Sequence, residues 1–242
     1  MAVKLEQLVQ QIDEILEPDR FSDYCPNGLQ VEGRSEVTRL VTGVTASQAL
    51  LDAAVAWNAD AILVHHGYFW RGEDPTVCGM KRRRLQTLLG HDISLLAYHL
   101  PLDAHPRYGN NVLLSRALGL QNLRRFGMYR GTEIGYEGRL PKAMPYERFK
   151  RRVAKVSGGE LRTMDFGKKL VKTVAVVSGG ASAEVIEAGQ KKIDVYVSGE
   201  AALSAYHNAQ EYGINAIFAG HYATETFGVR AVAGLLTKRL KV

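Results

Sequence analysis

Histidines and carboxylates stand where several expected strands of this 242-residue chain end. The clearest case is His65-His66, which directly follows the apolar run 62–64 (Ile-Leu-Val). A lone buried histidine is usually a core residue with satisfied hydrogen bonds, whereas two in succession at a strand end indicate metal ligation. Because neighbouring residues of a strand point to opposite sides, the two rings suit two metal ions side by side.

Two further segments each place a histidine four positions before a carboxylate as the chain leaves a strand. His99 precedes Asp103, and His221 precedes Glu225. A helix expected to begin near Ala223 would place Glu225 in its first turn, where exposed backbone N–H groups favour a carboxylate. With Glu200, which follows another strand, the candidate donors for one pocket are His65, His66, His99, His221, Asp103, Glu225 and Glu200. Nitrogen and oxygen donors without thiolates suit Zn, Fe, Mn or Ni, and this set is large enough for two divalent ions with a bridging carboxylate.

An internal repeat indicates how these residues are positioned. Segment 40–66 reads as strand, loop, helix and strand, and segment 174–200 has the same order at a constant offset of 134. The aligned pairs include Asp60 with Asp194, and His65-His66 with Gly199-Glu200. Chance similarity between two strand–helix–strand units is the alternative, but both copies end on potential ligands.

A second match aligns segment 91–103 with segment 213–225 at an offset of 122, which pairs His99 with His221. It likewise pairs Asp103 with Glu225. Strands that alternate with helices predict an α/β protein with largely parallel sheets, whose ligand sites lie beyond the carboxyl ends of the strands. We therefore expect two related halves in a pseudo-twofold arrangement with the metal site between them. The expected ranges are 1–120 for the first half with its N-terminal helix, 121–170 for a middle insert that covers or extends the site, and 171–242 for the second half.

Composition and charge narrow the class of protein. Cys25 and Cys78 are the only cysteines and lie far apart, which fits a reducing cytosol without structural disulfides. No apolar run reaches the length of a membrane span, and residues 1–16 read as an amphipathic surface helix rather than a signal peptide, so we expect a cytoplasmic protein. The net charge is +6, and basic residues cluster in short runs. Such runs are more often dispersed solvated faces than a site for an anionic partner such as nucleic acid.

A glycine-rich loop, 178–182 (Ser-Gly-Gly-Ala-Ser), stands between an expected strand and helix. A phosphate could bind at such a helix N-terminus, but the loop lacks the Lys-Ser/Thr of a phosphate-binding loop and the glycine spacing of a dinucleotide site. The interpretation favoured here is a tight turn with Ser182, or Ser47 in the first copy, near a helix cap.

Several long motifs carry a resemblance to a known family. They are NGLQVEG (27–33), VTGVTAS (41–47), HHGYFW (65–70), HLPLDAHPRYGNN (99–111), SGE (198–200) and AGHYATE (219–225). In this order they closely resemble the YbgI-like family, whose members are dinuclear-metal hexamers often named GTP cyclohydrolase 1 type 2 homologues. The resemblance runs from the first helix to about residue 237. The family typically ends in a strand of the type FIDIPNP, which residues 236–242 do not match.

The resemblance implies which residues hold the metals. They are the two histidines of the HHG motif, the aspartate of HLPLD, and the histidine and glutamate of GHxxxE, here His65, His66, Asp103, His221 and Glu225. His99 and Glu200 are then expected to orient ligands, line the pocket or transfer protons. For the remaining polar residues we expect hydrogen bonding or packing from His105 and Asn110, and surface or helix positions for His91 and His207.

Two functions fit these residues. The first is a dinuclear metal-dependent hydrolase acting on a nucleotide-like or phosphoester substrate, and the family name implies ring opening of GTP. The second is a non-catalytic ring-shaped scaffold that binds nucleic acid or a protein partner, with metals serving structure. A homohexamer is implied by the resemblance in both cases. The aromatic run 68–70 (Tyr-Phe-Trp) could stack bases in the second, but beside the ligand pair we expect it to pack the pocket floor.

Overall fold

The computed structural model describes residues 2–241 and divides into two compact units. Unit 1 runs to Leu102 and takes up the chain again at Gly228, whereas unit 2 is Asp103–Phe227. These boundaries differ from the expected ranges. Residues 103–120 belong to the second unit, and the segment 121–170 is an integral part of that unit. Most of the last helix belongs to the first unit.

Unit 1 is built on a four-stranded sheet of order β2-β6-β5-β4. Its elements before the boundary are β1 (Val3–Lys4), α1 (Leu5–Leu16), η1 (Pro18–Arg20), β2 (Gly28–Val31), β3 (Glu36–Val37), β4 (Leu40–Thr45), α2 (Gln48–Ala56), β5 (Ala61–His66), α3 (Gly79–Gly90) and β6 (Ser94–Ala97). Strands β4, β5 and β6 run parallel, and β2 pairs antiparallel with β6 at the edge. The inner strand β5 is apolar until it reaches the histidines, and it is buried as far as His65, as expected for a parallel strand covered on both faces.

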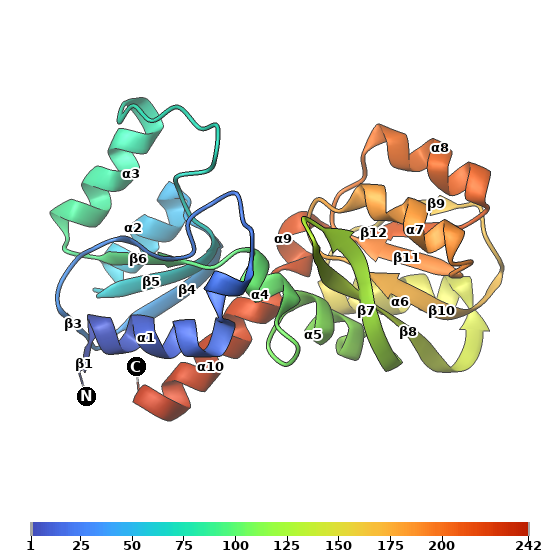
Figure 1. Ribbon diagram of the computed structural model, residues 1–242, viewed down its shortest axis with the longest axis horizontal. Coiled ribbons are helices and arrows are strands. Elements are labelled where there is room, and N and C mark those ends of the chain that lie inside the picture. Colours follow the sequence, from blue (N-terminus) through green and yellow to red (C-terminus); the bar gives the residue numbers. More distant parts are fainter. Residues whose placement is uncertain (1, 242) are drawn as a thin grey trace. The chain divides into compact units, whose positions relative to one another are not determined.

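Helices cover both faces of this sheet (Figure 1). Helices α2 and α3 lie on one face, while α1 and the later part of α10 (Thr226–Leu240) lie on the other. Helix α1 forms because Leu5, Leu8 and Ile12 recur at helical spacing on its buried side, as predicted. It ends where Glu17 adopts a left-handed conformation with φ of 48°. Ser47 is the N-cap of helix α2, and its side chain accepts the N–H of Leu50 at 3.3 Å, which confirms the predicted cap.

Unit 2 is built on a six-stranded sheet of order β7-β8-β10-β11-β12-β9. Following α4 (Leu100–Ala104), its elements are α5 (Asn110–Ala117), β7 (Gln121–Tyr129), β8 (Thr132–Pro145), α6 (Tyr146–Ser157), β9 (Arg162–Asp165), β10 (Leu170–Val176), η2 (Ser182–Glu184), α7 (Val185–Gln190), β11 (Val195–Ser198), α8 (Leu203–Tyr212), β12 (Asn215–Phe218) and α9 (His221–Thr224). Strands β10, β11 and β12 are parallel, while β8 and β9 pair antiparallel with the outer two.

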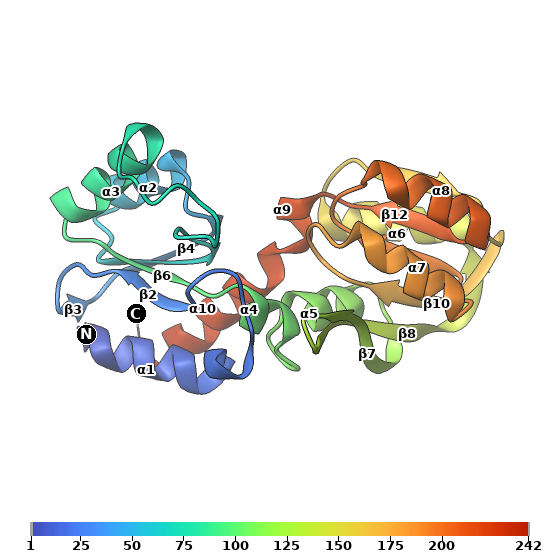
Figure 2. The same ribbon diagram turned by 45° about the horizontal axis from the view of Figure 1, so that its top comes forward.

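The helices of unit 2 also divide between two faces. Helices α7 and α8 cover one face, and α5 and α6 cover the other (Figure 2). The core on the α5 and α6 face contains Phe149 and Val153 from α6, packed with Val174 and Val195 from the central strands. Unit 2 is therefore an α/β layer structure of the same type as unit 1, with the extra strands β7 and β8 at one edge.

Strand pairing confirms the first part of the internal repeat. Leu40 pairs with Ala61 in unit 1, and Val174 pairs with Val195 in unit 2, both in parallel strands. Each residue of the second pair lies 134 positions after its counterpart. The expected pseudo-twofold relation of the two halves stays a prediction.

A buried aspartate closes the turn before the central strand of unit 1. Asp60 Oδ2 accepts the backbone N–H groups of Thr38 and Arg39 at 2.8 and 2.9 Å. Its Oδ1 accepts from the guanidinium of Arg34 at 2.8 Å. The Asp60 carboxylate thus links the start of β4 to the start of β5.

Asp194 closes the corresponding turn in unit 2. Its Oδ2 accepts the N–H groups of Lys172 and Thr173, both at 2.9 Å, and its Oδ1 accepts from Lys168 at 2.8 Å. Each of these partners lies 134 positions after its counterpart around Asp60. Burial alone would raise the pKa of Asp194, but Lys168 and the backbone N–H groups lower it below the ordinary value of 3.8.

The second part of the predicted repeat is wrong by one residue. Ala61 pairs with Ser94 in unit 1, whereas Val195 pairs with Asn215 in unit 2; an offset of 122 would have paired it with Ala216. The offset holds as far as the ends of α3 at Gly90 and α8 at Tyr212, but the loop that follows is one residue shorter in unit 2.

This shorter loop changes which ligands correspond. Helix α4 begins at Leu100 and α9 begins at His221, so His221 is the counterpart of Leu100 and not of His99. The structure also corrects the position of Glu225, which follows α9 and directly precedes α10 instead of lying in the first turn of a helix begun near Ala223.

The repeat extends further towards the N-terminus of each unit than the sequence match indicated. In unit 1 the edge strand pairs Gly28 with Ala97, and in unit 2 it pairs Arg162 with Phe218. Strand β9 again lies 134 positions after β2, and an amphipathic helix precedes each of them, α1 or α6. Among residues 2–241, none of the helices is long and apolar enough to cross a membrane.

Candidate metal centre

Unit 1 places His65 and His66 at the end of β5. The ring of His65 is fully buried, and its Nδ1 lies 3.0 Å from the backbone oxygen of Tyr98. Since a carbonyl oxygen can only accept, Nδ1 carries the proton, and Nε2 is the nitrogen with the lone pair. His66 Nδ1 lies 3.3 Å from Thr45 Oγ1.

Strand alternation predicted that the two rings point to opposite sides, and this prediction is wrong. Their centroids are only 4.5 Å apart, with an angle of 39° between the planes. The strand ends here, and the chain turns at Gly67, where a Cβ would come within 2.5 Å of Ala97 Cβ. Alternation therefore gives no argument for two ions.

His99 joins these two rings. Its ring centroid lies 5.1 Å from that of His65 and 5.7 Å from that of His66. One ring nitrogen from each of the three histidines can be chosen so that all lie within 4.8 Å of one another. This is a group of imidazoles that could hold a metal ion.

Asp23 fixes the orientation of His99. Its Oδ1 lies 2.9 Å from His99 Nδ1, and its Oδ2 accepts from Leu100 N and Asn27 Nδ2 at 2.9 and 3.1 Å. Burial would raise the pKa of this carboxyl, but the hydrogen bond and charge of His99, with the two other donors, lower it to about 2. Asp23 is therefore a carboxylate at neutral pH, and it directs the Nε2 edge of His99 away from itself.

Aromatic rings enclose the imidazole of His99. Tyr24 and Trp70 meet it edge-on, at centroid distances of 5.1 and 5.2 Å. Of the aromatic run 68–70, only Trp70 serves the site in this way. Tyr68 is buried in the core and donates its hydroxyl hydrogen to Ala46 O, and Phe69 lies beneath the ammonium of Lys81.

A second group near His99 is a poor metal site. Cys25 Sγ can be grouped with Asp23 and His99 within 4.8 Å. Burial and the charge of Asp23 raise the pKa of this thiol, and the thiol hydrogen-bonds to Asp23. A metal ion binding here would have to displace the thiol proton, because the thiolate is the ligand, and the raised pKa opposes this.

Unit 2 places Asp103 in a rigid hydrogen-bonded setting. The residue is 6% exposed, and its Oδ1 accepts from Asn110 Nδ2 at 2.9 Å and from Ser178 Oγ at 3.1 Å. Asn111 supports this arrangement because its Oδ1 accepts the N–H of Ser178 at 2.6 Å. Asn110 therefore hydrogen-bonds within the site, as predicted.

His221 lies between two carboxylates. Its Nδ1 is 2.9 Å from Glu200 Oε1, and its Nε2 is 3.1 Å from Glu225 Oε1. The hydrogen bond to Glu225 raises the pKa of His221 most; burial opposes this, and the charges of Glu225 and Glu200 bring the value to about 9. Glu225 is buried whereas Glu200 is largely exposed, so only the inner carboxylate is held by packing as well.

Gly179, in the glycine-rich loop, makes the close approach to this pair possible. It has φ of +68°, and a Cβ there would lie 2.3 Å from Glu225 Oε1 and 3.1 Å from His221 Nε2. The N–H of Gly179 also donates to Thr224 Oγ1 at 3.1 Å. The loop thus shapes the histidine–carboxylate pair. Ser182 begins η2 directly after a turn and the N-cap Ala181, so it lies near a helix cap as predicted, but its side chain does not form the cap hydrogen bond.

The remaining histidines lie where the sequence suggested. The ring of His105 accepts the N–H groups of Arg107 and Tyr108 through Nδ1 and stacks on Tyr108. His91 follows α3 on the surface, and His207 is exposed on α8. Sequence reasoning missed Asp23, whose contact with His99 spans 76 positions. No local sequence pattern marks that contact.

Comparison with known proteins shows the family of the chain. The sequence profile of Duf34/NIF3 (NGG1p interacting factor 3) matches residues 3–242. The chain belongs to the Duf34/NIF3 family. A Pseudomonas aeruginosa relative named GTP cyclohydrolase 1 type 2 homolog is 49% identical over 242 residues, covering 100% of this chain and 96% of that protein.

Solved structures of the family share the whole fold. One, described as protein ybgI of unknown function, is 42% identical with a TM-score of 0.93, covering 98% of this chain and 94% of that one. TTHA1606 from Thermus thermophilus is 37% identical with a TM-score of 0.88, covering 99% and 95%. This Duf34/NIF3 member therefore has the family's α/β fold, and it carries His, Asp and Glu groups that could hold metal ions.

The donor atoms of this Duf34/NIF3 protein suit a divalent cation. Two ligands about 2.1 Å from one ion lie roughly 3.0–3.4 Å apart at octahedral or tetrahedral angles. His221 Nε2 and Glu225 Oε1 are 3.1 Å apart. A metal ion bound there would displace any proton that the two atoms share, because ligation requires the neutral imidazole and the carboxylate.

Proposed function

We propose that this protein is a metal-dependent hydrolase that acts on a nucleotide-like or phosphoester substrate. Two divalent ions, Zn, Fe, Mn or Ni, are its cofactors. Their proposed ligands are His65, His66, Asp103, His221 and Glu225.

The observation that carries this proposal is common to the three proposed histidine ligands and to His99. In His65, His66, His99 and His221, the Nδ1 atom lies 2.9–3.3 Å from an oxygen atom. The oxygens belong to a backbone carbonyl, a hydroxyl and two carboxylates. Metal-binding histidines are held in this way, with one nitrogen bonded to an oxygen and the other directed to the ion.

The residues around the proposed ligands would accept and transfer protons. When bound, the ions would supply Lewis acidity and water of lowered pKa. His99 is suited to accept a proton at Nε2, since Asp23 holds its Nδ1–H and stabilises the imidazolium that forms. Trp70 and Tyr24 limit the access of water to this ring.

Glu200 orients His221 in this proposal. Its Oε1 is 2.9 Å from His221 Nδ1, and its side chain is 63% exposed. An exposed carboxylate can also exchange protons with solvent. Glu200 therefore positions a ligand, and it offers a route for a proton to leave.

The substrate class rests on the relatives. Proteins named GTP cyclohydrolase 1 type 2 homolog are 41–49% identical to this chain. GTP, other nucleotides and phosphoesters are therefore the compounds to test first, with opening of the guanine imidazole ring as one reaction to monitor.

Metal content and turnover together test the proposal. The protein would be stripped with a chelator, reloaded singly with Zn, Mn, Fe or Ni, and assayed against a panel of nucleotides and phosphoesters. We expect about two ions per chain and hydrolysis that disappears with the metal. Turnover that survives complete metal removal, or no turnover by any reloaded form, would reject the hydrolase.

Two variants separate ligation from proton transfer. His99→Ala and Glu200→Gln should retain metal and lose rate, since neither residue is a proposed ligand. His207→Ala, on the exposed surface of α8, is the matched control and should change neither. Loss of metal from His99→Ala would make His99 a ligand.

We also propose that copies of this chain assemble as a ring-shaped homohexamer, which the family resemblance implies. Large apolar side chains exposed on unit 2 support an interface there, since Leu203 is 84% exposed and Tyr222 is 66% exposed. Sedimentation at micromolar concentration should give a hexamer, and a stable monomer would reject the assembly.

A further inference from the structure

A cavity of unit 2 lies at the amino ends of β10 and β11. Its volume is about 680 Å³, and its charged lining residues are Arg124, Glu137, Arg139, Lys191 and Lys192. We call this cavity the basic groove. Four cations and one carboxylate leave it with three excess positive charges.

Strand pairing explains why these charges meet. Arg124 on β7 lies directly opposite Glu137 on β8, so both side chains stand on the same face of the sheet. Arg139 lies two positions after Glu137 and shares that face. Lys191 follows α7, and its ammonium lies 3.3 Å from Glu137 Oε2.

Glu137 and Glu187 together engage only one of the four cations. Lys191 contacts both carboxylates, at 3.3 and 2.9 Å. Within residues 2–241, the side chains of Arg124, Arg139 and Lys192 form no ion pair. Concave surfaces of one charge sign concentrate counter-ions, and like charges on adjacent strands repel until an anion lies between them.

Backbone conformation also singles out this groove. The register of β7 against β8 shifts between Gln121 and Arg124, and Asn122 within the shift has φ of 53°. Such irregularities redirect side chains. Lys192 has φ of 56°, at the position that Asn58 occupies in unit 1. Asparagine tolerates this conformation more readily than lysine does.

The corresponding region of unit 1 holds a smaller cavity. That cavity, lined by Asn58, is about 90 Å³, and its arginine, Arg34, is paired with Asp60. Strands β7 and β8, which have no counterpart in unit 1, supply Arg124 and Arg139. The basic groove is thus an addition to the repeated layer.

We propose that the basic groove binds a small molecule that carries several phosphate groups. Its volume fits a ligand of nucleotide size, and two guanidinium groups and an ammonium would each meet a phosphate oxygen. None of the described residues that line the groove is aromatic and available for base stacking, which favours an oligophosphate over single-stranded nucleic acid.

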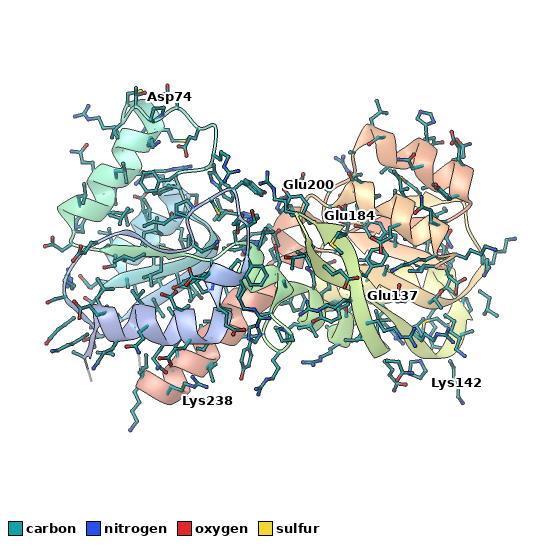
Figure 3. The ribbon with its side chains drawn as sticks, in the orientation of Figure 1. Asp74, Glu137, Lys142, Glu184, Glu200 and Lys238 are labelled. Carbon is teal, nitrogen blue, oxygen red and sulfur yellow. The ribbon has the colours of Figure 1, made fainter. Side chains whose placement is uncertain are left out.

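This is a separate site from the metal-centre residues of the same unit. The groove lies at the amino ends of parallel strands, whereas Glu200 and His221 follow the carboxyl ends of β11 and β12. Glu137 and Glu200 are labelled in Figure 3 and lie apart.

The test compares two charge-matched variants of the full-length, as-purified protein. The groove variant is Arg124→Gln/Arg139→Gln/Lys192→Gln. The control is Arg148→Gln/Arg151→Gln/Lys155→Gln, which removes the same charges from exposed positions of α6. Titration calorimetry would use inorganic triphosphate, orthophosphate and a single-stranded oligonucleotide, and circular dichroism would verify folding.

We expect triphosphate to bind more tightly than orthophosphate. The groove variant should lose about tenfold or more in affinity, equivalent to about 1.4 kcal/mol, and the control should stay within about twofold of wild type. Any triphosphate held by metal affects both variants equally. Equal losses in the two variants, equal affinity for orthophosphate, or a loss confined to the oligonucleotide would overturn the proposal.

Discussion

Gly179→Ala provides a sharp test of how the histidine–carboxylate pair is built. A Cβ at this position would lie 2.3 Å from Glu225 Oε1 and 3.1 Å from His221 Nε2. The carboxylate would have to move by about 1 Å to restore an ordinary van der Waals contact. Glu225 is 2% exposed, so it has little room to move. Alanine in the left-handed conformation of Gly179 adds strain of about 1–2 kcal/mol.

The expected result is a folded protein with impaired metal binding. The free energy of unfolding should fall by about 1–3 kcal/mol, a loss that a core of this size tolerates. A donor displaced by about 1 Å cannot keep a bond of about 2.1 Å, so metal affinity should fall by about 10- to 100-fold. Calorimetric titration with Zn or Mn after chelation measures this directly.

Gly180→Ala is the matched control. A Cβ there would approach only to 3.8 Å of Glu200 Oε2 and His221 Cε1, an ordinary contact, and its φ is not positive. Its metal affinity and melting temperature should stay near wild type. If Gly179→Ala binds metal as tightly as Gly180→Ala, the pair formed by His221 and Glu225 is not a metal site.

Three further outcomes are expected. Asp194→Ala should lower the free energy of unfolding by about 2–4 kcal/mol in chemical denaturation, because two buried N–H groups lose their acceptor, and Asp60→Ala should cost a similar amount. The pKa of Asp194 is lowered in the folded state, so its contribution to the free energy of unfolding is complete above pH 3.8 and is lost as the pH falls through the lowered value. The difference in free energy of unfolding between wild type and Asp194→Ala should therefore fall over that pH range, and a constant difference would contradict this. Asp23→Asn should keep its metal but slow any substrate's turnover by about 10²–10⁴-fold, since it no longer holds His99 as the basic tautomer, and unchanged kcat would remove His99 from proton transfer.

Much of the layer structure could be predicted because the repeat preserves strand register. The offset of 134 relates strands β4 and β5 to β10 and β11, and even the partners of Asp60 and Asp194. The match failed by one residue after α8 because a shortened loop leaves the apolar pattern of the next strand unchanged. The segment 121–170 looked like an insert because β9 is a largely exposed edge strand that carries no apolar signature.

The candidate site was predictable in residue type but not in geometry. Strand alternation wrongly predicted that the rings of His65 and His66 point to opposite sides, because alternation applies only while the strand remains regular. Asp23 escaped because a hydrogen bond across 76 positions leaves no local pattern. Gly179 was interpreted as part of a turn, whereas its lack of a Cβ is what admits Glu225. Sequence spacing therefore indicates which residues could be metal ligands, whereas the hydrogen bonds and close contacts that orient them are visible only in the structure.

Anomalous scattering from a crystal of the reloaded protein tests the central claim most directly. Data collected at the absorption edge of the loaded metal locate each ion without assumptions about its ligands. The proposal predicts two peaks per chain, each within about 2.0–2.3 Å of atoms from His65, His66, Asp103, His221 and Glu225. Peaks absent from these residues, or ions bound only elsewhere on the chain, would contradict it.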